Sequence, residues 1–139
     1  MSHAERNYAH RSLFDKLGVT AASRIALVGP HDEAFVDELN VRLAKAAIVR
    51  PRATYDLVFV RVDRPLDLAR IAASVKYLKP ESALWVFHPK GRGASPADAE
   101  VRAAGLAAGL VDNKISAYSD THTATRYVIP LTRRPTPSS

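Results

Sequence analysis

Side chains able to transfer protons or bind metal ions follow directly after three apolar segments of this sequence. His31 and Asp32 follow the first segment. Asp63 follows the second and His88 follows the third. Histidine changes charge near neutral pH and is a common metal ligand, and carboxylates can act as acids or bases. Asp32 and Asp63 could instead cap helices, which is the interpretation we favour. His31, His88 and His122 lack the spacing of a metal site, so we predict that no metal is bound.

The segment Lys90-Gly91-Arg92-Gly93 has the composition of an anion-binding loop. Its two glycines can expose backbone amides, and its two cations add positive charge near the start of a helix. A flexible, solvated loop is the other interpretation of the same residues.

Hydrophobic patterning predicts alternating strands and helices to position these groups. The predicted strands comprise residues 24–28, 55–62, 83–88, 110–117 and 124–129. The predicted helices comprise residues 11–17, 33–46, 65–78 and 95–108, and Ala47–Val49 could form a strand stub. The second and third strands are apolar on both faces, which is typical of strands covered by helices on each side, and Trp85 is predicted to lie in the core. The order of elements predicts a three-layer α/β sandwich with a mainly parallel sheet and an antiparallel C-terminal hairpin strand.

Topology then predicts where a ligand would bind. Ligands of open parallel sheets bind beyond the carboxyl ends of the strands, so the loops that follow the strands should meet at one rim. If strand 110–117 is parallel to the third strand, the turn at 119–122 emerges at the same edge. Asp32 and Asp120 also belong to these loops, and no catalytic residue is assigned. The candidate ligand-binding residues on the rim are Gly29, His31, Asp63, His88, Lys90, Arg92 and His122.

Composition narrows the class of protein. The 139 residues are predicted to form one domain over 1–131 and a flexible tail over 132–139. The absence of cysteine excludes disulfides, a thiol nucleophile and thiolate metal sites. The net charge of +6 raises the question of a nucleic-acid partner, but the basic residues are scattered and only ten residues are aromatic, so we expect none. No apolar run is long enough to span a membrane, and a cytoplasmic location is expected.

Several segments resemble a known fold family. The last two-thirds of the chain is similar to the carboxy-terminal half of class I S-adenosylmethionine-dependent methyltransferases, with Tyr55–Val60, Lys79–Val86 and Ala107–Val111 as the matching segments. Nearly the whole chain resembles a bacterial family of short, uncharacterised proteins with that fold. The segments that carry this second resemblance are Lys16–Val19, Arg24–Leu27, Leu84–Val86 with Pro89–Gly91, and Ala108–Asp112 with Lys114. The resemblance implies a fold and not an activity.

The chain departs from the methyltransferase pattern at the cofactor loop. Such enzymes need several glycines after their first strand, because the backbone approaches the cofactor closely, whereas Gly29-Pro30-His31-Asp32 contains one glycine. Between Ala46 and Tyr55 there is also too little chain for the strand whose acidic residue binds the ribose. We therefore expect no cofactor, and binding of S-adenosylmethionine is kept as the alternative.

These observations predict a noncatalytic, methyltransferase-like domain that binds a small anionic ligand or a protein partner at the rim. A minimal S-adenosylmethionine-dependent methyltransferase is one alternative, and a nucleic-acid-binding protein is another. Loss of two strands would leave the first strand near a sheet edge, which is compatible with a homodimer.

Overall fold

The sheet at the centre of the molecule has five strands in the order β1-β2-β3-β5-β4. The computed structural model describes residues 12–43 and 53–133. The strands are β1 (Ile25–Val28), β2 (Tyr55–Arg61), β3 (Leu78–Pro89), β4 (Val111–Ala117) and β5 (His122–Val128). The helices are α2 (Glu33–Arg42), α3 (Ala69–Ser74) and α4 (Asp98–Ala107), with a further helical segment at 12–17.

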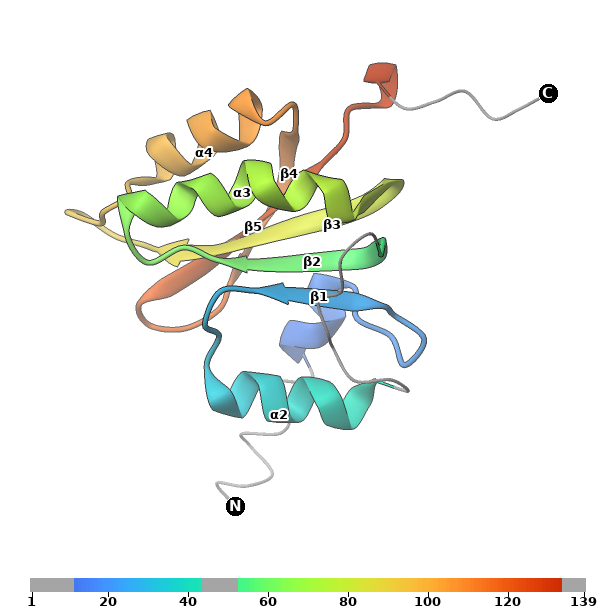
Figure 1. Ribbon diagram of the computed structural model, residues 1–139. Helices are drawn as coiled ribbons and strands as arrows, with labels where there is room; N and C mark the ends of the chain where they lie inside the picture. Colours follow the sequence, from blue (N-terminus) through green and yellow to red (C-terminus); the bar gives the residue numbers. More distant parts are fainter. Residues whose placement is uncertain (1–11, 44–52, 134–139) are drawn as a thin grey trace.

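Strands β1, β2 and β3 run parallel, and β5 returns antiparallel between β3 and β4. Helix α2 and the segment at 12–17 lie on one face of the sheet, and α3 and α4 lie on the other (Figure 1). The predicted three-layer α/β sandwich is therefore confirmed. Within the described residues β1 has only β2 as a neighbour, and the homodimer stays a prediction.

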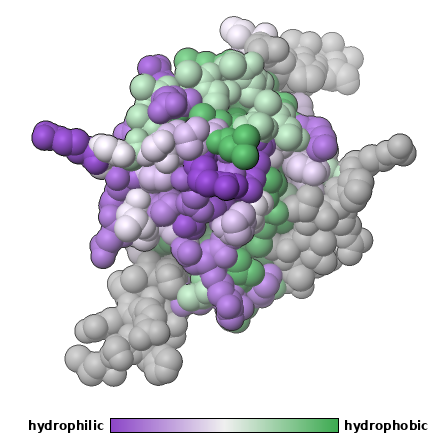
Figure 2. Space-filling model, turned by 60° about the vertical axis from the view of Figure 1, so that its left-hand side comes forward, coloured by the Kyte–Doolittle hydropathy of each residue, from purple (hydrophilic) through white to green (hydrophobic). Residues whose placement is uncertain are grey.

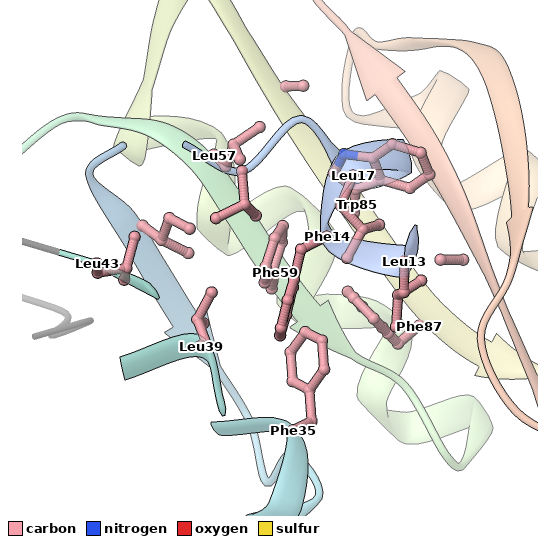
Figure 3. Packing of buried hydrophobic residues seen from close by; sticks show 14 of the residues in the cluster. Leu13, Phe14, Leu17, Phe35, Leu39, Leu43, Leu57, Phe59, Trp85 and Phe87 are labelled. Atoms are coloured by element: carbon pink, nitrogen blue, oxygen red, sulfur yellow. The ribbon is translucent and has the colours of Figure 1, made fainter. Parts of the chain in front are cut away.

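The face beneath α2 holds an aromatic core (Figure 3). Phe35 from α2 packs against Phe59 of β2 and Phe87 of β3, with ring centroids 5.9 and 5.5 Å apart. Trp85 of β3 is fully buried in the same cluster, as its position in the sequence predicted. Each large apolar side chain removed from water stabilises the fold by roughly 1.5–3 kcal/mol, so this cluster anchors α2 to the sheet.

The opposite face is covered by α3 and α4, and α4 approaches the sheet closely. Gly105 of α4 lies directly on the Tyr127 ring, where an added Cβ would overlap the aromatic carbons. Val101 and Gly105 are the buried residues of this helix. The absence of a side chain at Gly105 permits this close approach.

The boundaries of some elements differ from the prediction. β3 begins at Leu78 instead of residue 83, because Leu78 pairs with Tyr55 before a bulge restores pairing at Ala83. Pro80 lies in that bulge, where no ladder hydrogen bond is required of it. The predicted helix at 65–78 is divided into 3-10 turns at Pro65–Leu68 and Val75–Tyr77 around the short α3.

Two predicted segments, the end of the helix at 33–46 and the C-terminal tail, are described only in part. α2 ends at Arg42, and the predicted continuation to residue 46 and the stub Ala47–Val49 lie outside the described residues. A 3-10 turn covers Leu131–Arg133, and the remainder of the predicted tail also lies outside them. Among the helices of 12–43 and 53–133, none has the length and apolar character needed to cross a bilayer.

Candidate binding site at the carboxyl ends of the strands

The loops that follow β1, β2 and β3 meet the β4–β5 turn at one edge of the sheet, because β4 is parallel to β3. His122, the first residue of β5, places its Nε2 atom 2.7 Å from Oδ1 of Asp63, which follows β2. Figure 2 turns this edge toward the viewer and shows hydrophilic residues gathered at its centre, with hydrophobic residues beside them. The predicted convergence of these two loops is therefore observed.

A buried arginine connects the side chains on the α2 side of this edge. Arg61, the last residue of β2, is 8% exposed and donates from Nε to both carboxylate oxygens of Asp63, at 2.9 and 3.1 Å. Its Nη1 atom lies 3.4 Å from Oδ2 of Asp32, which also accepts a 2.7 Å hydrogen bond from the Tyr118 hydroxyl. We call Tyr118, Asp32, Arg61, Asp63 and His122 the rim network.

Electrostatics keeps both carboxylates of the rim network ionised. The hydrogen bond from Tyr118, with help from Arg61, lowers the pKa of Asp32. Burial works against ionisation of Asp63, but hydrogen bonds from His122 and Arg61 outweigh it and lower its pKa. Burial and the bond to Asp32 raise the pKa of Tyr118, so this phenol stays protonated. The carboxylates are therefore poor proton carriers near neutral pH.

The predicted capping role of Asp32 and Asp63 is wrong. Asp32 occupies the N-cap position of α2, but its side chain makes no capping hydrogen bond. Both carboxylates are drawn instead to Arg61, whose buried charge needs partners. Asp67 is the carboxylate that caps the turn after β2, and its Oδ2 accepts the backbone amides of Asp63 and Arg64 at 3.0 and 3.1 Å.

Gly29 lies in the turn after β1, and the side chain of Arg70 fills the space beside it. The glycine has a φ of 85°, and an added Cβ would lie 2.7 Å from Nη1 of Arg70. Arg70, from α3, donates from Nη1 to the carbonyl of Arg61 at 2.8 Å and pairs with Asp67 at 3.3 Å. The guanidinium is thus held across the turn by two contacts.

The ring of His31 packs into the aromatic core. Its Nε2 atom lies 2.9 Å from the carbonyl of Phe59, so this nitrogen carries the proton in the neutral ring. The ring meets Phe87 edge-on with centroids 5.3 Å apart, and burial lowers the pKa of His31. Its Nδ1 atom is buried without a hydrogen-bond partner.

A pocket of about 220 Å³ opens on the α4 side of the same edge. We call it the α4 pocket. Its lining includes His88, Lys90, Arg102, Thr125 and Tyr127. His88 is 2% exposed, its Nε2 atom lies 2.9 Å from the Thr125 hydroxyl, and burial lowers its pKa. Burial raises the pKa of Tyr127 to about 12, so its hydroxyl stays protonated.

The charges that line the α4 pocket are only partly paired. Arg102 lies 3.3 Å from Asp112, and Asp98 lies 3.7 Å from Nδ1 of His88 with its side chain mostly exposed. In the described part of the chain, Lys90 has no carboxylate within ion-pair distance. The pocket therefore offers a cation, hydroxyl groups and apolar walls.

The seven predicted site residues thus separate into groups. Asp63 meets His122, and His88 meets Lys90 in the α4 pocket. Arg92 is exposed on its turn, as is Asp120, which belongs to the same group of loops. His31, His88 and His122 point to different surroundings, and within 12–43 and 53–133 no group of three potential ligands could hold a metal ion.

Arg61 and Tyr118 belong to the rim network, and neither was among the residues predicted from the sequence. Arg61 had a usable signal, because it is the one charged residue in the run Leu57–Val62 and a charge on a buried strand requires a partner. Asp63 stands two residues later and so points to the same face. Tyr118 had no comparable signal, since its partner Asp32 lies far away in the sequence.

Comparison with solved structures defines the class of fold. The magnesium protoporphyrin IX methyltransferase ChlM from Synechocystis PCC 6803, solved with bound SAM, matches with a TM-score of 0.61 and 11% identity over 90% of this chain and 80% of that one. CalO1, a methyltransferase of calicheamicin biosynthesis solved with SAH, matches with a TM-score of 0.61 and 14% identity over 93% of this chain and 55% of that one. The chain has a methyltransferase-like, Rossmann-type α/β fold.

Proteins of other activity share this fold. A pericyclic reaction enzyme also matches, with a TM-score of 0.53 and 14% identity over 88% of this chain and 40% of that one. The chain therefore spans well under two thirds of some of these relatives. No family model and no curated protein matches the sequence, so the resemblance to a bacterial family of short proteins stays a prediction. At these identities the likeness shows the fold alone.

Proposed function

We propose that this chain is a noncatalytic, methyltransferase-like binding domain, which takes a small anionic ligand in the α4 pocket instead of a methyl donor beside Gly29. The single observation that carries the proposal is the Arg70 guanidinium lying across the Gly29 turn. A cofactor cleft of this fold depends on a glycine turn that the ligand can approach, and here a protein side chain occupies that approach.

The residues at the turn do not fit S-adenosylmethionine, the cofactor that ChlM holds. Displacing Arg70 would break its bonds to the carbonyl of Arg61 and to Asp67. The two carboxylates of the rim network, Asp32 and Asp63, are already engaged by Arg61 and so are poor partners for ribose hydroxyls. We derive no methyl-transfer step for this reason.

The lining of the α4 pocket supports the proposal that a small anionic ligand binds there. Lys90 supplies a positive charge at its mouth, and the Thr125 and Tyr127 hydroxyls lie deeper among mostly apolar walls. A pocket of about 220 Å³ with this lining suits a small molecule that has an apolar body and one carboxylate. Asp98 and Asp112 disfavour a ligand with several negative charges.

Calorimetric titration with S-adenosylmethionine and S-adenosylhomocysteine tests the claim that the chain binds no methyl donor. We expect no heat of binding from the wild-type protein at micromolar concentrations. Micromolar binding of either compound would overturn the proposal in favour of the minimal methyltransferase, which the SAM- and SAH-bound neighbours keep as the alternative.

Amide chemical shifts during titration with benzoate test the claim that the α4 pocket binds a small anion. We expect saturable shifts at His88, Lys90 and Thr125, and we expect Lys90→Gln to weaken binding. Arg92→Gln is the matched control, because Arg92 is an exposed cation two residues away that does not line the pocket. Equal loss in both variants, or shifts confined to other residues, would contradict a site in the α4 pocket.

A further inference from the structure

A second pocket lies on the α2 face, toward the amino ends of the parallel strands. Its volume is about 320 Å³. We call it the amino-end pocket, and it is lined by Asp15, Lys16, Leu17, Gly18, Leu57, Lys114 and Arg126. Leu57 pairs with Ile25, the first residue of β1, so the pocket is at the opposite end of the strands from the rim network. The segments around Lys16 and Lys114, singled out in the sequence, meet here.

Three cations from three different elements line the amino-end pocket. Lys16 lies in the last turn of the helical segment at 12–17, Lys114 lies on β4 and Arg126 lies on β5. Among the residues that the structure describes, none of the three forms an ion pair with a carboxylate. Asp15 is the one carboxylate in the lining, and it lies 3.8 Å from Arg42 with its side chain 70% exposed. The positive charge of the pocket is therefore largely uncompensated.

Neutral oxygen atoms hold two of these cations in position. Lys114 donates from Nζ to the carbonyl of Lys16 at 3.2 Å. Arg126 donates from Nη1 to the side-chain oxygen of Asn113 at 3.2 Å. Neither bond removes the charge of the donor, and each restricts the conformations of a long side chain. Less conformational entropy is then lost when an anion binds.

The fully buried indole of Trp85 is a neighbour of Arg126 and is not part of the pocket lining. Trp85 pairs directly with Arg126 across β3 and β5, so the two side chains are neighbours on the same face. The indole nitrogen is buried and has no hydrogen-bond partner. In Figure 3 this nitrogen lies on the side of the ring that faces Leu57, a residue of the pocket lining. Trp85 therefore serves as a fluorescent reporter beside Arg126 and not as a contact of the ligand.

We infer that the amino-end pocket binds the phosphate group of a small phosphomonoester. A phosphate dianion matches the excess of two positive charges in the lining, and its oxygens suit both the forked guanidinium of Arg126 and the ammonium groups of Lys16 and Lys114. Leu17 and Leu57 leave an apolar wall for the rest of the ligand. The site is on the opposite face from the α4 pocket and does not depend on it.

The fluorescence of Trp85 provides the test, because it is the only tryptophan in the chain. Titration with glycerol 3-phosphate is expected to change the emission saturably, and titration with glycerol is expected to leave it unchanged. Lys114→Gln and Arg126→Gln should each weaken binding about tenfold, the effect of one charge-assisted hydrogen bond. Lys76→Gln is the matched control, because Lys76 is exposed and outside both pockets, and it should bind as the wild type does.

Further variants separate a binding role from a structural one. Arg126→Lys keeps the charge and loses the fork, so its affinity should fall between those of the wild type and Arg126→Gln. Circular dichroism melting of each variant checks that the fold persists. Three outcomes would overturn the inference: no saturable change at millimolar glycerol 3-phosphate, binding that is unaffected in Lys114→Gln and Arg126→Gln, or binding of a single-stranded oligonucleotide alone.

Discussion

The rim network and the α4 pocket lie at the same edge of the sheet. In the rim network, which we call the closed region, charged side chains pair with one another. The α4 pocket, which we call the open region, leaves space for a ligand. On the α2 side, Arg61 is held between Asp32 and Asp63. On the α4 side, Lys90 has no carboxylate partner in the described residues, and a pocket of about 220 Å³ remains. Shared topology therefore brings loops together without deciding whether a ligand can enter between them.

Burial explains the difference. Arg61 is 8% exposed, and a guanidinium removed from water is tolerated only when carboxylates and hydrogen-bond acceptors surround it. Lys90 is exposed and solvated, so it gains little from an ion pair and stays available. The buried charge of Arg61 is therefore paired with neighbouring side chains, whereas the exposed charge of Lys90 stays accessible to a ligand.

The largest expected effect comes from removing the charge at the centre of the closed region. Arg61→Met should lower the free energy of unfolding by about 2–3 kcal/mol, because it removes the charge-assisted bonds from Arg61 to Asp32 and Asp63, whose bonds to Tyr118 and His122 remain. Urea unfolding measures this change. Thr125→Val in the open region removes one hydrogen bond to His88 and should cost only about 1 kcal/mol. Equal losses would mean that the two regions are held alike.

The next largest effect concerns the packing of α4 against Tyr127, which lines the α4 pocket. Gly105→Ala should destabilise the protein by about 2 kcal/mol, because the new methyl group overlaps the buried Tyr127 ring and outweighs the gain in helix propensity. Thermal unfolding gives the change. Gly105→Ala in a Tyr127→Leu background should recover part of the loss, and a stabilised single variant would show that α4 moves freely away from the sheet.

A smaller effect measures how firmly Arg70 closes the turn after β1. Gly29→Ala and Gly93→Ala both place a side chain at positive φ, but only the first meets a guanidinium, since Gly93 has open space around its α-carbon. Gly29→Ala should therefore be about 1 kcal/mol more destabilising than Gly93→Ala, through loss of the Arg70 bond to the Arg61 carbonyl. Identical unfolding midpoints would show that Arg70 contributes nothing to closure.

The smallest effect is a pH dependence shared by both regions. Burial lowers the pKa of His31 and of His88 below 6.5, so the unfolded chain binds more protons than the folded one just below that pH. This contribution to stability should be complete well above pH 6.5 and be lost progressively as the pH falls through 6.5 and below. The carboxylates with lowered pKa, Asp32 and Asp63, lose their contribution only at still lower pH.

Urea unfolding of His31→Asn and His88→Gln across this pH range assigns the dependence. Each substitution removes one buried imidazole, one from each side of the sheet, and should make the slope of stability against pH shallower. A slope that neither substitution changes would place the titrating group elsewhere.

Much of the fold was predictable because the signals are local. The runs Ile25–Val28 and Leu57–Val60 are apolar on both faces, and such runs form buried parallel strands whatever the loops contain. The start of β3 at Leu78 was not predictable, because a bulge and the Ser82 hydroxyl bond to the Tyr55 carbonyl determine it. Both depend on a strand that is distant in sequence.

The candidate site was predicted in its location and not in its contacts. Connectivity alone brought Asp63 and His122 to one edge, where they form a 2.7 Å hydrogen bond. The capping roles of Asp32 and Asp63 failed because Arg61 competes for both carboxylates. Which of several donors a carboxylate binds depends on distances that sequence spacing does not contain.

By itself, the order of apolar runs and turn residues in the sequence determined a parallel α/β sandwich and the edge at which its loops converge. The tertiary structure alone decided that Arg61 and Arg70 close one side of that edge, that the α4 pocket stays open on the other, and that Lys16, Lys114 and Arg126 meet at the far end of the strands. The physical reason is range: hydrophobic periodicity acts over neighbouring residues, whereas charge pairing and pocket shape depend on residues that only the folded sheet brings together.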